Sequence, residues 1–202
     1  MFGITVVTPP TLEPISLDEA KAHLRFYVNH EEDLIRSLIT AARMYCETYT
    51  GKSFITQTLR LTRDTFPDYR EGYEFRLPRP PLLTVTSIQY TDTASATQTV
   101  SSSLYVVDTT PEVGRVGLAY GETWPTDAIE QIGAVKVNYT AGYGPAASNV
   151  PKTIKQAMLL LIGHWFVNRE AAITGTIQTT TEIAVSALLG TAWSGQLTAD
   201  FG

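Results

Sequence analysis

The stretch VPKTIKQAMLLLIGHWFVNREAA, at residues 150–172, decides how the chain folds. Pro151 suits the first turn of a helix, because its ring fixes φ near the helical value and its missing N–H is not needed there. From Ala157 to Val167 only Gly163 and His164 interrupt the apolar run. A helix that is apolar nearly all round is buried on several sides. We therefore expect a long core helix, part of whose cover comes from a neighbouring subunit.

The apolar run does not predict a membrane span. It is shorter than the roughly 18 to 20 apolar residues that a span needs, and Lys152, Lys155, Arg169 and Glu170 flank it. The opening residues MFGITVVTPP have no positively charged region and too short an apolar core for a signal peptide. We expect no membrane segment.

Two helices are predicted upstream of the core helix. Residues 1–14 are expected to form an extended arm that ends in prolines. Ser16 and Glu19 fit a capping box, in which the hydroxyl accepts from the N3 amide and the carboxylate accepts from the N-cap amide. A short helix over 17–27 follows.

Asn29 and Glu32 repeat the capping-box spacing and predict a second, longer helix that ends near Tyr49. This helix carries a wide apolar face, with Tyr45 among its residues. Gly51 suits the left-handed position that follows a helix end.

The hydrophobic period changes from helical to two after residue 54. Six short strands are predicted, around residues 55–61, 73–77, 83–90, 104–107, 114–119 and 134–139. Gly142 and Gly144 predict a tight turn that leads into the core helix. Strands at this spacing form a small antiparallel sheet or sandwich.

The last part of the chain is polar over 174–181 and then apolar again. A short final helix is predicted over 183–193. We therefore predict an α+β fold with three parts: a small helical bundle of residues 1–53 and 145–193, an inserted β-rich domain of residues 54–144, and a flexible tail of residues 194–202.

The composition is that of an ordinary globular protein, with 202 residues, 44% hydrophobic and 17% charged. The formal net charge of −5 excludes a global positive field that would draw the chain to DNA or to anionic lipid. The single Cys46 cannot form an internal disulfide, which fits a reducing compartment.

No group of residues predicts catalysis, a metal site or a cofactor site. His23, His30 and His164 are far apart and lack a second ligand at i+4. Cys46 lies in an apolar helical stripe, where a lone cysteine usually serves packing. The acidic residues near 18–19 and 31–33 lie in first helical turns, where they stabilise the helix dipole.

Several stretches, in this order, resemble the head–tail connector (adaptor, or head-completion) proteins of long-tailed bacteriophages, in the branch that carries a β insertion. These stretches are ISLDEAKAHLR (15–25), EEDLIRSLITAARMYCETYTGKSF (31–54), LPRPPLLTVTSIQYTD (77–92), YVVD (105–108), WP (124–125), VNYTAGYG (137–144) and VPKTIKQAMLLLIGHWFVNREA (150–171). Together they cover most of residues 15–172. After the polar loop Leu188 and Leu189 match the family's leucine pair, but the family's proline before it and the basic residue after it are missing.

The resemblance implies a homo-oligomeric ring, usually dodecameric, beneath the portal protein of a filled capsid. Such a connector extends the DNA channel and offers a surface to the next head-completion or tail protein. It implies no enzymatic activity, cofactor or metal. The expected location is the virion, at the head–tail interface, after synthesis in the cytoplasm of a bacterial host. The net negative charge fits a channel through which DNA passes without specific binding.

Two groups of residues are candidates for the contacts of such a ring. The hypothesised subunit-interface residues are Trp165, Phe166 and Arg169. The hypothesised portal-docking residues are Leu188, Leu189, Trp193, Leu197 and Phe201. The last three lie in an end that has too few apolar groups to anchor itself and would become ordered on a partner.

Two other functions remain open from the residues alone. The ten tyrosines, seven phenylalanines and three tryptophans also suit a β-rich module over 54–140 that binds a carbohydrate or a host receptor. A cysteine hydrolase that uses Cys46, with His23 as its base, is the third candidate.

Overall fold

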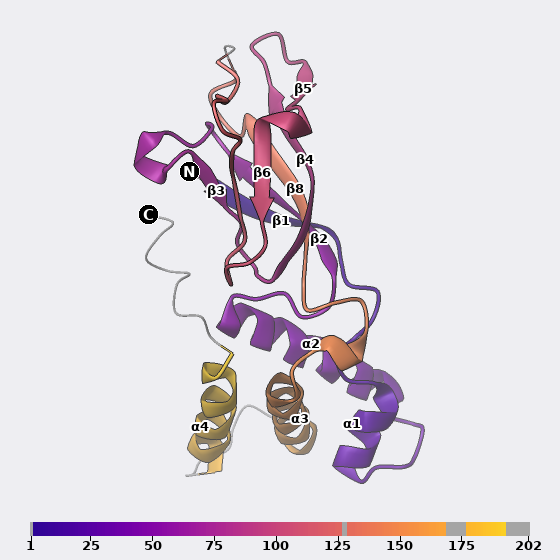
Figure 1. The fold of residues 1–202 in the computed structure, drawn as a ribbon. Helices are drawn as coiled ribbons and strands as arrows, with labels where there is room; N and C mark the ends of the chain where they lie inside the picture. Colours follow the sequence, from indigo (N-terminus) through magenta and orange to yellow (C-terminus); the bar gives the residue numbers. More distant parts are fainter. Residues whose placement is uncertain (1, 127–128, 169–176, 193–202) are drawn as a thin grey trace. The chain divides into compact units, whose positions relative to one another are not determined.

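The computed structural model describes residues 2–126, 129–168 and 177–192 (Figure 1). The chain forms two compact units, which we call the β unit (residues 1–10 and 56–142) and the helical unit (residues 11–55 and 143–202). The predicted mixed α+β class is confirmed. The assignment of the first ten residues to the helical part is wrong, because they contain a strand of the β unit.

The β unit contains two antiparallel sheets that share one apolar core. The first sheet has the strand order β1-β2-β8-β4-β5, and the second has the order β3-β7-β6. The strands are β1 (Phe2–Thr8), β2 (Gln57–Arg63), β3 (Glu74–Arg76), β4 (Leu82–Thr91), β5 (Thr97–Thr99), β6 (Tyr105–Asp108), β7 (Arg115–Leu118) and β8 (Val135–Ala141). Short 3₁₀ turns occur at Tyr69–Glu71, Ser102–Leu104 and Ala147–Asn149.

All six predicted strands are present, and two further strands, β1 and β5, were not predicted. The predicted extended arm is in fact partly a strand, since Phe2–Thr8 pairs along β2. Every residue of β1 and of β5 is exposed. Neither strand therefore has the alternation of buried and exposed residues on which a sequence-based prediction depends.

The helical unit contains α1 (Leu17–Leu24), α2 (Glu32–Thr50), α3 (Lys152–Val167) and α4 (Ile177–Gly190). The predicted capping box of α1 is confirmed: Ser16 Oγ accepts from the Glu19 N–H at 3.1 Å, and Glu19 Oε2 accepts from the Ser16 N–H at 2.9 Å. The helix ends three residues earlier than predicted, because Arg25 adopts a left-handed conformation with φ of 52°.

The capping box predicted at the start of α2 is wrong, because no side chain caps this helix. Lys21 Nζ instead donates to Asn29 Oδ1 at 2.9 Å and to Glu32 Oε1 at 2.7 Å. Through these two hydrogen bonds, Lys21 of α1 contacts both the first turn of α2 and the residues before it. Gly51 follows α2 with φ of 67°, as predicted.

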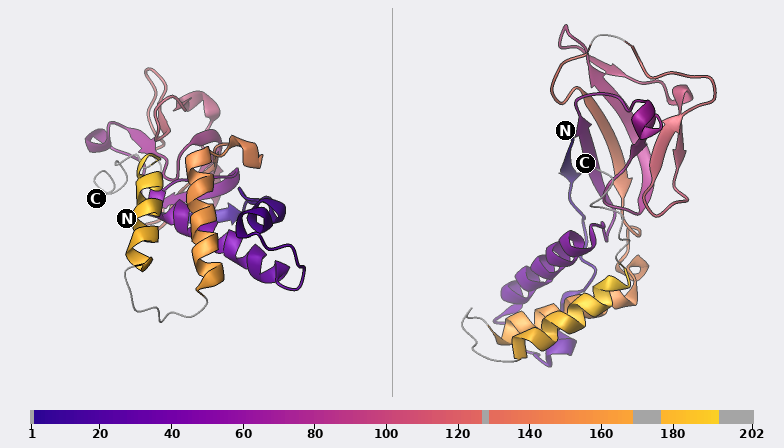
Figure 2. Two further views of the ribbon diagram at one scale, coloured as in Figure 1. Left: turned by 90° about the horizontal axis from the view of Figure 1, so that it is seen from below. Right: turned by 90° about the vertical axis from the view of Figure 1, so that its left-hand side faces the viewer.

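The core helix α3 packs against all three other helices of its unit, and α4 runs beside it (Figure 2). Its buried residues are Ile154, Ala157, Met158, Leu161 and Ile162. Their own chain covers these five residues, so any cover from a neighbouring subunit concerns only the rest of the helix. Trp165 and Phe166 near the C-terminal end are half-buried, and Val167 is 76% exposed.

The last helix begins at Ile177 and not at Ile183. Part of the threonine-rich stretch that was predicted as a loop is therefore helical. Val185 and Leu189 are buried in the helical core. The predicted flexible tail, residues 194–202, lies outside the described residues.

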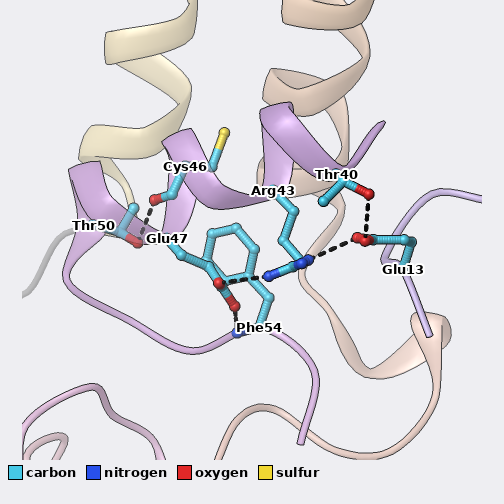
Figure 3. A network of polar contacts seen from close by, with 7 residues as sticks. All are labelled: Glu13, Thr40, Arg43, Cys46, Glu47, Thr50 and Phe54. Atoms are coloured by element: carbon cyan, nitrogen blue, oxygen red, sulfur yellow. Dashed lines mark hydrogen bonds and ion pairs between the residues drawn. The ribbon is translucent and has the colours of Figure 1, made fainter. Parts of the chain in front are cut away.

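A partly buried polar network links α2 to the segment before α1 and to the segment after α2 (Figure 3). Arg43 Nε donates to Glu13 Oε2 at 2.7 Å, and Arg43 Nη1 donates to Glu47 Oε2 at 3.0 Å. The other Glu47 oxygen accepts from the Phe54 N–H at 2.9 Å, and Thr40 donates to Glu13. Burial by itself would lower the pKa of Arg43, but the hydrogen bond and the charge of Glu13, with those of Glu47, raise it.

We predict that Glu47→Ala lowers the free energy of unfolding by about 3 to 5 kcal/mol, because it removes one of the two carboxylates that pair with the partly buried Arg43 and leaves the Phe54 N–H without its acceptor. Urea unfolding followed by circular dichroism measures the loss. Arg36→Ala, which removes an exposed ion pair with Glu32, is the matched control and should change little. Equal midpoints for Glu47→Ala and the wild type would contradict the prediction.

We also predict that Gly144→Ala destabilises the turn before α3 by about 1 to 3 kcal/mol. Gly144 has φ of +147°, and a Cβ placed there would lie 2.6 Å from Asn149 Oδ1. Gly3→Ala is the control, because an added Cβ there meets no atom within 4 Å. Thermal melting of the two variants checks this, and equal melting temperatures would refute it.

Candidate functional site

One face of α2 is exposed and without charge, and it is apolar around Met44, Tyr45 and Tyr49. Its exposed residues after Arg36, which we call the α2 face, are Ser37, Ala41, Met44, Tyr45, Thr48 and Tyr49. Met44 is 57% exposed, Tyr45 45% and Tyr49 43%. A grouped apolar surface of this kind marks a contact with another protein more often than scattered exposed residues do.

The charged side chains of the same half of α2 point inward. Arg43 and Glu47 are the only charged residues between Arg36 and the end of the helix, and both belong to the buried network. Glu47 is only 3% exposed. This part of α2 therefore reverses the usual arrangement of a surface helix, in which charged residues face water.

The sequence pattern placed Tyr45 in one wide apolar face of α2, and the structure shows that Tyr45 lies on the exposed part of that face. The predicted apolar face was wider than one protein core can cover. Its excess width was the signal that part of it is exposed. The exposed part is the one that lies opposite the inward-facing pair of Arg43 and Glu47.

Trp165, a predicted interface residue, borders the α2 face. Its ring lies edge-on to Tyr45, with centroids 6.1 Å apart, and Tyr45 stacks on Tyr49 at 6.4 Å. Phe166 lies elsewhere: its ring contacts Phe26, in the connection between α1 and α2, at 5.2 Å. The structure thus joins Trp165 to the α2 face and separates Phe166 from it, and Arg169 lies outside the described residues.

The hypothesised portal-docking residues also do not share one environment. Leu189 is fully buried, and Leu188 is half-buried against the same core. The exposed side of α4 carries Ile183 and Ala184 instead. Trp193, Leu197 and Phe201 lie outside the described residues.

The cysteine does not have the properties of a nucleophile. Cys46 is fully buried, and burial together with the neighbouring charge of Glu47 raises the pKa of its thiol to about 12. Asn168, the residue that follows α3, donates to the His164 carbonyl at 2.9 Å and lies 3.2 Å from the His164 ring nitrogen Nδ1. Within the described ranges no three histidine, cysteine or acidic residues are grouped as metal ligands would be. None of the described helices is long and apolar enough to span a membrane.

Several solved structures share this fold. The chain is similar to a chain in the neck of an empty gene transfer agent (GTA) particle computed with C6 symmetry, with a TM-score of 0.75, 24% identity and 98% of each chain covered. It is similar to a chain of the virion of a native GTA particle, with a TM-score of 0.75, 22% identity and 97% of each chain covered. A third match is to the neck of a native GTA particle computed with C12 symmetry, with a TM-score of 0.72, 23% identity and 98% of each chain covered.

No curated protein matches the chain. A family model described as "Head completion protein" does, and it matches residues 13–187. These residues include all four helices except the last turn of α4, and seven of the eight strands. The chain therefore belongs to the head completion protein family.

Proposed function

We propose that the chain is a structural head–tail connector, which forms a ring under the portal protein, extends the DNA channel and joins the capsid to the tail. The family match over residues 13–187 carries this proposal. The similar chains of GTA necks, computed with C6 and C12 symmetry, support a ring as the working assembly. The expected partners are the portal protein on one side and the next head-completion or tail protein on the other.

The α2 face supports a ring in physical terms. A closed ring repeats one contact head to tail, so each copy needs an apolar surface that stays exposed in the isolated chain. Met44, Tyr45 and Tyr49 provide such a surface, and Trp165 extends it. Tyrosine, tryptophan and methionine are enriched in protein interfaces. We propose that this surface lies between adjacent copies.

The proposal is tested by measuring mass with light scattering, for the chain alone and after mixing with its cognate portal protein. A complex that holds many copies of the chain per portal is the expected result. A mixture in which both proteins keep their separate masses would refute the connector function.

We predict that Ala41→Glu with Met44→Glu prevents ring formation on the portal without unfolding the chain. Both positions are exposed, so the free energy of unfolding should change by no more than about 0.5 kcal/mol. Two carboxylates on the α2 face would have to be desolvated at the contact. Thr153→Glu, at an exposed position in the first turn of α3, is the control and should assemble normally. Normal rings from the double variant would contradict the assignment of this face.

We further predict that a chain truncated after Gly190 keeps its fold but binds the portal more weakly. Leu189, the last fully buried residue of the described chain, is retained, whereas Trp193, Leu197 and Phe201 are removed. Circular dichroism checks the fold, and biolayer interferometry against the immobilised portal checks the affinity. Equal affinities of the truncated and full chains would show that the end takes no part in docking.

A further inference from the structure

The five-stranded sheet of the β unit contains no acidic residue. None of the residues of β1, β2, β4, β5 and β8 is Asp or Glu. The chain as a whole has 20 acidic residues and a formal net charge of −5. The small sheet differs, since its Glu74 and Asp108 pair with Arg115. The strands of the large sheet therefore carry no negative side chain, although the protein as a whole has a net negative charge.

The two faces of this sheet have different chemistry. Leu59, Val137 and Tyr139 are typical of the buried face, which packs into the core of the β unit. The opposite face, which we call the outer face, carries partly exposed polar residues on the three central strands of the sheet. They are Thr58, Arg60 and Thr62 of β2, Lys136, Asn138 and Thr140 of β8, and Ser87 and Gln89 of β4.

The side chains of the outer face hold Arg60 in a fixed direction. Arg60 Nε donates to Asn138 Oδ1 at 2.8 Å. Asn138 Nδ2 in turn donates to Ser87 Oγ at 3.0 Å and to Gln89 Oε1 at 3.3 Å. No side chain in the described part of the protein accepts from the two terminal nitrogens of Arg60, and the Lys136 ammonium has no acceptor there either. The outer face thus presents two positive groups and several hydroxyl and amide groups.

We propose that the outer face contacts the phosphate backbone of double-stranded DNA, which rests on the proposed connector function. Phosphate oxygens accept from arginine and lysine and from serine, threonine, asparagine and glutamine side chains, and these contacts carry no sequence information. The outer face offers this set of groups without an acidic side chain to repel the phosphates. The pre-oriented guanidinium of Arg60 is suited to a phosphate because its fork of donors matches two oxygens.

The contact is weak enough for DNA to move past it. Two phosphate contacts per chain predict that log K falls with log salt concentration with a slope of about −1.8. A ring repeats these contacts around the duplex, while each single contact breaks and re-forms easily. The outer face therefore guides DNA without holding one sequence.

The experiment is a fluorescence anisotropy titration of a labelled DNA duplex of about 20 base pairs with the full-length chain, between about 20 and 200 mM salt. The wild type should bind with a slope of about −1.8, and R60A/K136A should lose at least about tenfold in affinity at the lowest salt, with a slope near zero. R60Q/K136Q should show the same loss. Asn138→Ala, which frees Arg60 to move, should give an intermediate affinity.

The control is R36A/K152A, which removes the same charge from exposed positions of the helical unit and should bind as the wild type does. Thermal melting of each variant shows that it is folded. Three results would overturn the proposal: a wild type that does not bind at the lowest salt, a wild-type slope for R60A/K136A, or an equal loss in R36A/K152A. Loss of binding to a tail-side protein in R60A/K136A, with no DNA binding by the wild type, would assign the outer face to an acidic protein instead.

The outcome of this DNA-binding experiment can be distinguished from the outcome of the test of the connector function. Rings on the portal with DNA binding that does not depend on Arg60 and Lys136 would refute this inference alone. DNA binding through these residues by a chain that forms no ring would refute the connector function and leave the contact in place.

Discussion

The inward-facing pair of Arg43 and Glu47, of which Glu47 is buried and Arg43 partly buried, is the interaction on which the surface of the helical unit depends. Removing two charges from water costs free energy, and the chain recovers it only because Glu13 and the Phe54 N–H complete the hydrogen bonds. With both charges turned inward, the neighbouring turns of α2 have only uncharged side chains left for the outside. The polar network inside the unit and the apolar face outside it are two results of one arrangement.

This arrangement suits the proposed connector, which must fold by itself before it assembles into a ring. The five central residues of α3 are buried by their own chain, so the unit does not need a partner to form its core. The α2 face with Trp165 is additional apolar surface, which the fold leaves exposed. A component of a particle needs this division, because it must be stable before assembly and adhesive at one place.

The sequence predicted the elements whose signal is local. The Ser16–Glu19 box, Gly51 after α2 and the alternating strands each follow from a few neighbouring residues. The errors concern pairs that lie apart in the chain. Asn29 and Glu32 look like a cap, but Lys21 binds both. Residues 2–8 have no burial pattern, and only their pairing with β2 makes them a strand. Which part of the wide apolar face of α2 is exposed depends on the contact of Arg43 with Glu13, thirty residues earlier.

The most direct test of the account is an electron microscopy map of the particle neck at a resolution that shows side chains. We expect a ring of this chain at the portal exit, with Met44, Tyr45 and Trp165 buried between adjacent copies. A neck without such a ring, or a ring in which these three side chains face solvent, would contradict it.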